Sequence, residues 1–176
     1  AARNLGLKRS KFEYLYFVDG DDLLDINAIS IFNSVIINDP NYGLYAANRI
    51  TEDQKLKVTG IESKDFDLNE YFNQLIRFQN LCWTSAVIVN KRLLGGGKFN
   101  ENFSHGEDRD FFIRIIRQNK GYWINRIVAT YMDDPNGLSA GPIHKNEDLF
   151  WLRFRNHYSS NKLNSKLFFY NSKYRF

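Results

Sequence analysis

The chain has 176 residues, of which 43% are hydrophobic and 25% charged, and it carries a formal net charge of +4. This balance is typical of a folded globular domain and argues against a disordered chain. No apolar run approaches the ~20 residues that a membrane-spanning helix needs, and no signal peptide is recognisable. The single cysteine, Cys82, excludes an internal disulfide and favours a reducing compartment. We therefore expect a cytoplasmic protein.

The first part of the chain predicts strands and helices in alternation. Residues 12–18 are short, aromatic and bounded by charge, as in a buried strand. Residues 28–37 place apolar side chains at helical spacing, and the Asn-Asp-Pro-Asn stretch at 38–41 ends that helix. The further predictions here are strands at 42–50 and 56–58 and a helix at 68–78.

The second part continues the alternation. The predicted elements are a buried strand at 85–89, a glycine break at 95–97, a strong helix at 107–118, a strand at 122–131, a loop at 133–142 and a helix at 147–158. Strands that alternate with helices predict an α/β fold with a largely parallel sheet. Ligands of such sheets bind at the carboxyl ends of the strands.

Three carboxylates, Asp19, Asp21 and Asp22, follow the predicted 12–18 strand within four positions. Such crowded like charges repel one another, and a hard cation such as Mg²⁺ or Mn²⁺ that bridges to phosphate oxygens would compensate them. Gly20 lets the backbone turn sharply and lets a bulky ligand approach. The alternative is a plain turn in which Asp22 or Asp25 caps the following helix.

A second acidic pair, Glu107 and Asp108, opens the predicted 107–118 helix. The helix N-terminus would keep Asp108 ionised, and an ionised carboxylate beside a substrate can act as a general base. A plain helix start with an acidic first turn is the alternative, and taken alone it is the more frequent case. Together, the two clusters would equip a site that displaces a nucleoside diphosphate with a hydroxyl group.

Four segments occur in order: AARNLG, YLYFVDGDDLL, a strand followed by Gly-Gly-x-Phe, and GEDRDFFIR. They make residues 1–131 resemble the family-2 inverting glycosyltransferases of the GT-A fold, and the NGLS loop at 136–139 resembles the bacterial members that build capsules, O-antigens and other surface glycans. The resemblance implies a GT-A domain over 1–148, with a mostly parallel sheet flanked by helices. Family members begin with a nucleoside-binding strand and a further β-α unit, which would precede residue 1. We therefore expect an N-terminally truncated domain.

The resemblance also assigns roles to individual residues. Asp21 would hold the Mn²⁺ or Mg²⁺ that bridges the diphosphate, with Asp19 near the ribose or the metal and Asp22 as a supporting neighbour. Asp108 would be the catalytic base of a single displacement that inverts the anomeric configuration. The other implied positions are Arg3 and Asn4 at the nucleotide, and Trp83, Thr84, Ser85, Gly96, His105 and Glu107 near the transferred sugar or the acceptor.

The implied partners are a nucleotide-diphosphate sugar as donor and a glycan or lipid-linked acceptor, and no motif points to a nucleic acid. Residues 149–176 contain no Asp or Glu but six Lys or Arg residues, interleaved with aromatic residues. Such a tail is typical of a membrane-surface contact, which would place the protein at the inner membrane face. A pair of helices that packs its aromatic residues on the core is equally compatible with this pattern.

Two other functions fit parts of the sequence. A Mg-dependent phosphohydrolase of the haloacid-dehalogenase type also ends a hydrophobic strand with Asp-x-Asp, but its motif continues with Gly and Thr where this chain has Asp22 and Leu23. A non-catalytic module that binds a sugar or a partner would explain the aromatic residues and the glycine-rich loops, but not the two acidic clusters. We therefore predict an inverting, metal-dependent glycosyltransferase of cell-surface polysaccharide synthesis.

Overall fold

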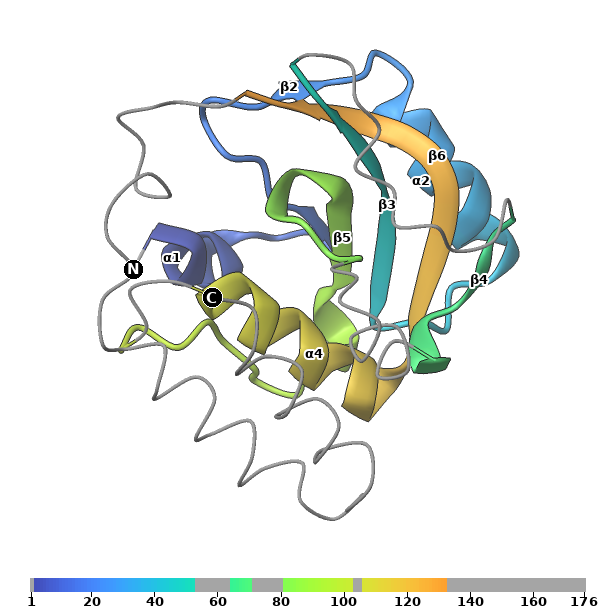
Figure 1. Cartoon of the computed structure of the whole chain (residues 1–176). Helices are drawn as coiled ribbons and strands as arrows, with labels where there is room; N and C mark the ends of the chain where they lie inside the picture. The colour runs from blue at the N-terminus through green and yellow to red at the C-terminus, as the bar shows by residue number, and fades with distance from the viewer. Residues whose placement is uncertain (1, 53–63, 71–80, 103–105, 133–176) are drawn as a thin grey trace, which may run out of the picture.

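A computed structural model describes residues 2–52, 64–70, 81–102 and 106–132, and these form a six-stranded sheet with helices on both faces (Figure 1). The strands are β1 (Tyr14–Tyr16), β2 (Leu23–Leu24), β3 (Leu44–Thr51), β4 (Phe66–Asp67), β5 (Val87–Asn90) and β6 (Gly121–Tyr131). The described α-helices are α1 (Ala2–Arg9), α2 (Ala28–Asn38) and α4 (Glu107–Asn119). Short 3-10 turns lie at η1 (Leu68–Glu70), η2 (Thr84–Ala86) and η3 (Lys91–Leu93).

The strand order is β1-β5-β3-β6-β2, and β4 also pairs with β6. Of these pairs only β3 with β6 is parallel, whereas β5 runs antiparallel to β1 and β3, and β2 and β4 run antiparallel to β6. The α/β class is confirmed, but the prediction of a largely parallel sheet is wrong. The alternation of strands and helices along the chain does not fix the direction in which a strand enters the sheet. Strand β5 enters from the edge at which β1 and β3 end, so it must run the opposite way.

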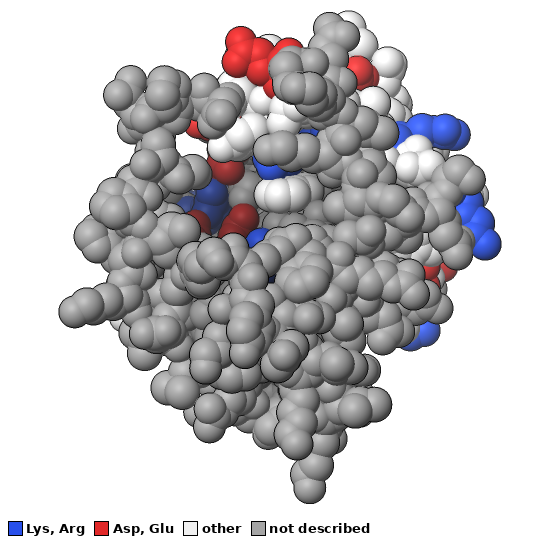
Figure 2. All heavy atoms as spheres, viewed as in Figure 1, with Lys and Arg blue, Asp and Glu red and all other residues white. Residues whose placement is uncertain are grey.

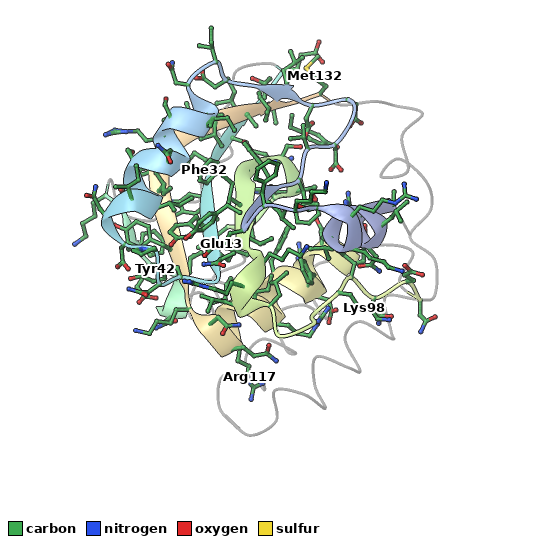
Figure 3. The ribbon with its side chains drawn as sticks, turned by 180° about the vertical axis from the view of Figure 1, so that it is seen from behind. Glu13, Phe32, Tyr42, Lys98, Arg117 and Met132 are labelled. Atoms are coloured by element: carbon green, nitrogen blue, oxygen red, sulfur yellow. The ribbon has the colours of Figure 1, made fainter. Side chains whose placement is uncertain are left out.

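The sheet is buried on both faces because its central strands alternate between two cores. Leu44 and Ala46 of β3 face the cluster that contains the apolar side of α4, whereas Tyr45 and Ala47 face the cluster beneath α2. On that second face Phe32 of α2 is fully buried and packs edge-on against the Tyr16 ring, with the ring centres 5.2 Å apart (Figure 3). This burial explains the continuous apolar runs of the central strands.

The helices predicted at 28–37 and 107–118 and the strands predicted at 42–50, 85–89 and 122–131 correspond to α2, α4, β3, β5 and β6, and the predicted 12–18 strand is reduced to β1. Residues 68–70 of the predicted 68–78 helix form η1, and its remainder is not described. The elements predicted at 56–58, 133–142 and 147–158, and the domain boundary at 148, also lie outside the described residues. Among those that are described, no helix is long and apolar enough to cross a membrane.

Candidate active site

The candidate site lies where the carboxyl ends of several strands meet, and we call this side of the sheet its edge. Strands β1, β3 and β6 run in the same direction, so their carboxyl ends meet there, and the reversed β5 begins there. In Figure 3 Met132, just past β6, lies at this edge, and Tyr42, just before β3, lies at the opposite one. In Figure 2 acidic and basic atoms gather in a hollow above the place that α1 occupies in Figure 1. The edge therefore brings together residues that are far apart in the sequence.

Residues 19–22, which follow β1 and which we call the acidic turn, are held by hydrogen bonds from three segments. The turn itself is closed by the Asp22 N–H, which donates to the Asp19 carbonyl oxygen at 3.2 Å. The Ser85 hydroxyl accepts the Asp19 N–H at 3.0 Å and also bonds the Asp22 carboxylate. The Met132 N–H donates to the same carboxylate at 3.3 Å. Asp22 therefore joins the ends of β1 and β6.

The alternative in which Asp22 caps the next helix is wrong. The N-cap of α2 is Asn27, whose side chain makes no capping hydrogen bond. Asp25 supports this start in another way, because its carboxylate accepts the Asn27 N–H at 2.7 Å and its carbonyl oxygen accepts the Ala28 N–H at 2.9 Å. The carboxylates of the acidic turn are therefore not consumed in starting α2.

Arg3 of α1 connects the two acidic clusters. Its Nη2 donates to Asp19 Oδ1 at 2.7 Å, and its Nη1 donates to Glu107 Oε1 at the start of α4. Burial by itself would lower the pKa of Arg3, but the hydrogen bond to Asp19 and the charges of Asp19, Glu107 and Asp108 raise it above its ordinary value. Arg3 therefore stays protonated and fixes the end of β1 relative to the start of α4.

The predicted base, Asp108, lies in the first turn of α4, which begins as predicted at Glu107. Gly106 precedes the helix with φ 72°, a left-handed conformation that glycine adopts without steric cost. The Asp108 carboxylate accepts the Arg109 N–H at 2.7 Å and lies 3.4 Å from the Thr84 hydroxyl, which donates to it. These two donors hold the carboxylate in one orientation at the start of α4.

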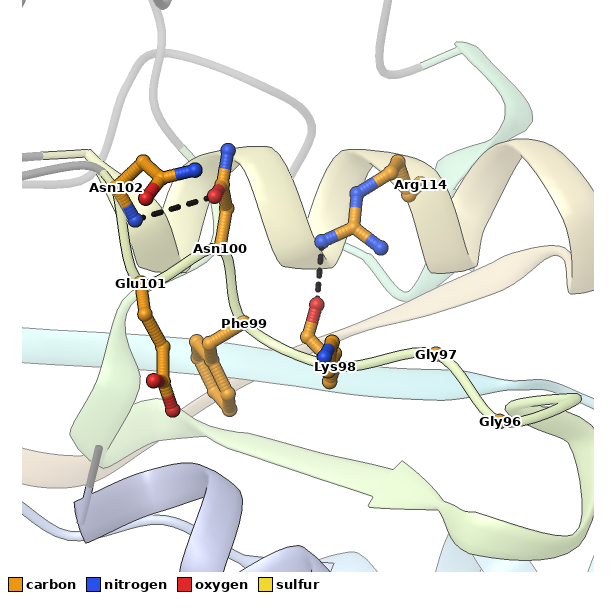
Figure 4. A pocket seen from close by; sticks show the side chains of 8 residues that line it. All are labelled: Gly96, Gly97, Lys98, Phe99, Asn100, Glu101, Asn102 and Arg114. Carbon is orange, nitrogen blue, oxygen red and sulfur yellow. Dashed lines mark hydrogen bonds between the residues drawn. The ribbon is translucent and has the colours of Figure 1, made fainter.

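The other predicted site residues fall into different places. The Asn4 side chain bonds the backbone N–H and carbonyl of Phe99, at 2.8 and 2.9 Å, so its amide holds the loop that leads to α4. Gly96 lines a separate pocket of about 460 Å³ between that loop and α4, beside Phe99 and Arg114 (Figure 4). Ser85 supports the acidic turn, and His105 lies outside the described residues.

Arg49, near the end of β3, belongs to this edge but was not predicted as a site residue. Its guanidinium carbon lies 3.6 Å from the centre of the Trp83 ring and 4.2 Å from that of the Tyr131 ring. The signal in the sequence is an arginine within the apolar stretch LYAANRI. That signal is weak, because such an arginine can equally lie on an exposed strand end.

The acidic turn suits a cation only in part. Among the described residues no group of three His, Cys, Asp or Glu side chains is placed to hold a metal ion. Asp19 is paired with Arg3, and Asp22 bonds Ser85 and Met132, but the Asp21 carboxylate is exposed and has no described partner. A divalent cation could therefore use Asp21 and would take further ligands from a bound phosphate and water, as Mg²⁺ commonly does.

We expect Asp22→Asn to raise the Tm of the full-length protein by about 1–3 °C at pH 7. Burial raises the pKa of Asp22, the hydrogen bonds from Ser85 and Met132 oppose this, and the charges of Asp19 and Asp21 add to it, so its pKa lies above the ordinary 3.8. Because the folded state holds this proton more tightly, the free energy of unfolding falls as the pH rises from about 3.8 through the folded pKa. An amide avoids this loss. Calorimetry between pH 4 and 7 checks it, and the difference should shrink toward pH 4; a variant Tm at or below wild type at pH 7 would contradict it.

The fold described above matches that of solved structures of S. aureus TarS. The crystal structure of residues 1–349 of S. aureus TarS in complex with UDP-GlcNAc matches this chain with a TM-score of 0.64 at 14% identity, over 88% of this chain and 46% of that one. A second TarS 1–349 structure matches with a TM-score of 0.59 at 16% identity, over 87% and 42% of the two chains. At these identities the likeness establishes the fold alone.

Sequence comparison gives a more particular relative. The poly(ribitol-phosphate) beta-N-acetylglucosaminyltransferase TarP of Staphylococcus aureus (strain N315) is 28% identical over 149 residues, which cover 78% of this chain and 44% of TarP. No family model matches the chain. The chain is thus a distant homologue of TarP with the fold of TarS, and the resemblance to family-2 glycosyltransferases is confirmed at that level. It spans less than half the length of these relatives.

Proposed function

We propose that the protein containing this chain is an inverting glycosyltransferase that moves a sugar from a nucleotide-diphosphate donor to a hydroxyl group of a cell-surface polymer. The observation that carries the proposal is the joining of the acidic turn to the start of α4 by Arg3, which holds Asp19 and Glu107 together. The bridge lies at the same edge as Asp108 of α4 and as Asp21, a carboxylate without a partner among the described residues. A structural turn and a plain helix start would not need to be linked.

The relatives favour a particular substrate pair. TarS was crystallised with UDP-GlcNAc, and TarP is named for the transfer of N-acetylglucosamine to poly(ribitol-phosphate). We therefore assign UDP-GlcNAc as the donor and a polyol-phosphate polymer as the acceptor.

The Asp108 carboxylate would take the proton of the acceptor hydroxyl as that oxygen attacks the anomeric carbon. The new C–O bond forms on the face opposite the diphosphate, whose bond to the anomeric carbon breaks and whose oxygen keeps the electron pair. Thr84 and the Arg109 N–H hold the carboxylate in one orientation, which positions it before the reaction. One base therefore suffices, and no covalent intermediate is required.

A Mn²⁺ or Mg²⁺ ion, when bound, would supply positive charge to the departing diphosphate. Asp21 is the residue that would hold it, with Asp19 beside it and fixed by Arg3. The oxygen-only ligand set of this turn suits a hard cation.

Product analysis of the full-length protein with UDP-GlcNAc and poly(ribitol-phosphate) tests the proposal. We expect release of UDP and an NMR spectrum that shows a β-linked sugar, because UDP-GlcNAc is an α-anomer and the reaction inverts it. Free phosphate from a phosphomonoester, without sugar transfer, would instead identify a phosphohydrolase. Binding of the sugar nucleotide without turnover in any acceptor mixture would identify a binding module.

We expect Asp21→Ala to lower the Mn²⁺-dependent affinity for UDP by about tenfold or more, because one carboxylate ligand of the cation is lost. Calorimetric titration of UDP into the full-length protein, with Mn²⁺ and with EDTA, measures this effect. Asp67→Ala is the matched control, since Asp67 pairs with Tyr122 at the far end of β6. If the affinity of Asp21→Ala for UDP differs between Mn²⁺ and EDTA as much as that of the wild type does, the assignment of Asp21 to the metal is contradicted.

Membrane attachment through residues 149–176 remains a prediction, because this segment lies outside the described residues. The charge pattern of the tail predicts stronger sedimentation of the full-length protein with anionic vesicles than with neutral ones, and the difference should vanish at high salt. Equal sedimentation with both kinds of vesicle would remove the electrostatic argument for the inner membrane face.

A further inference from the structure

Arg49 is buried to an extent that is unusual for a charged side chain. It is 7% exposed on β3, and its guanidinium lies over the rings of Trp83 and Tyr131. Contact with aromatic faces compensates part of the cost of removing the cation from water. The two rings cannot supply acceptors for hydrogen bonds in the plane of the guanidinium.

The hydrogen-bonding capacity of Arg49 is unfilled. Its Nε is buried without a hydrogen-bond partner, and no ion pair or hydrogen bond of its guanidinium is found among the described residues. Three other arginines behave differently: Arg3, Arg92 and Arg114 each pair with a carboxylate. A buried polar group without a hydrogen-bond partner is energetically costly. A buried, unpartnered guanidinium at this edge therefore indicates that a ligand supplies the missing acceptors.

The position of Arg49 indicates what that ligand carries. Burial lowers the pKa of Arg49, and the negative charges of Asp22, Asp108 and Asp19 oppose this. Arg49 is therefore within electrostatic reach of both the acidic turn and the proposed base. Among the described residues, Arg49 has no carboxylate partner, whereas Arg3 is occupied by Asp19 and Glu107.

We propose that Arg49 binds a phosphate group of a substrate at this edge. This inference rests on the proposed function, which brings two kinds of phosphate to the site: the diphosphate of the donor and the phosphodiester of a polyol-phosphate acceptor. A guanidinium offers a planar set of N–H donors that matches two phosphate oxygens, and its charge offsets theirs. The rings of Trp83 and Tyr131 contact the guanidinium but offer it no negatively charged oxygen, which a phosphate would supply.

Titrations of the full-length protein with Arg49→Gln and Arg49→Lys test this contact. Uridine, UDP and inorganic pyrophosphate are the probes, the intrinsic fluorescence that includes the adjacent Trp83 is the signal, and thermal unfolding verifies that each variant is folded. Arg92→Gln is the matched control, because Arg92 is exposed and pairs only with Glu13. The Michaelis constants for UDP-GlcNAc and poly(ribitol-phosphate) complete the set, and Arg49→Lys keeps the test open if Arg49→Gln fails to fold.

A donor phosphate contact predicts that Arg49→Gln weakens UDP and pyrophosphate binding about tenfold or more while uridine binding stays unchanged. An acceptor contact predicts unchanged UDP binding and a KM for poly(ribitol-phosphate) raised by a similar factor. In either case Arg49→Lys should recover part of the loss. Changes below about twofold throughout, or an equal loss for uridine, would overturn the proposal.

The binding titrations need no turnover, so they test the phosphate contact of Arg49 separately from the transferase function. If the wild-type protein transfers no sugar but binds pyrophosphate through Arg49, the phosphate contact stands and the transferase function falls. If the wild-type protein transfers sugar and neither Arg49 variant changes any constant, the phosphate contact alone falls. A wild-type protein that binds none of the phosphate probes overturns the contact.

Discussion

Replacing Asp108 by Asn in the full-length protein should lower the rate of sugar transfer by about a hundredfold or more, because general-base catalysis contributes about that much. An Asn side chain can still accept the Arg109 N–H through its oxygen and can donate from its NH2 group to the Thr84 hydroxyl, but it cannot take a proton from the acceptor. The affinity for UDP and the Tm should therefore stay close to those of the wild type. Steady-state kinetics at saturating donor, with UDP release as the readout, measure the loss.

Asp110→Asn is the control for this prediction, because it alters a carboxylate of the same helix that has a structural role. Asp110 is 6% exposed and pairs with Arg114 at 2.9 Å. Its replacement should lower the free energy of unfolding by about 1–3 kcal/mol and leave the rate per folded molecule near that of the wild type. If Asp108→Asn transfers sugar at the wild-type rate, Asp108 is not the base.

The second large effect should follow from Arg3→Met. The change leaves Asp19 and Glu107 partly buried without their cation, beside the other carboxylates of the site. We expect the free energy of unfolding to fall by about 1–3 kcal/mol and the affinity for UDP to fall as the acidic turn loses its anchor. Urea unfolding and UDP titration of the full-length protein measure the two losses.

A double-mutant cycle with Glu107→Gln separates the bridge from other roles of Arg3. If Arg3 acts by pairing with Glu107, the double variant should be more stable than the sum of the two single losses predicts. Arg3→Lys keeps the charge, but its single ammonium group cannot contact both carboxylates as the planar guanidinium does. The free energy of unfolding of Arg3→Lys should therefore lie between those of the wild type and Arg3→Met. Strictly additive losses would show that the bridge carries no coupling energy.

Much of the local structure could be predicted because it depends on neighbours in the sequence. The apolar spacing of α2 and α4 marks the face that each helix buries, and the observed helices follow the predicted ones closely. The position of Asp19 after β1 and that of Asp108 in the first turn of α4 are equally local. For this reason the two acidic clusters could be found before their distance in space was known.

The links between these clusters could not be predicted, because each depends on residues that are distant in the chain. Asn4 is predicted at the nucleotide, and the structure adds that its amide bonds the backbone of Phe99. Ser85 is predicted near the sugar or the acceptor, and the structure adds that its hydroxyl bonds the Asp19 N–H and the Asp22 carboxylate. Pairing of this kind follows from the order of the strands, which periodicity does not specify.

By itself, then, the sequence determined the α/β class, the two helices that cover the sheet and the positions of the two acidic clusters, since side-chain type and spacing act over short range. Only the tertiary structure decided that β5 is reversed, because strand direction depends on the edge from which the chain returns. It also decided that Arg3 joins the clusters and that Arg49 contacts the rings of Trp83 and Tyr131, since those contacts form only after the strands have paired.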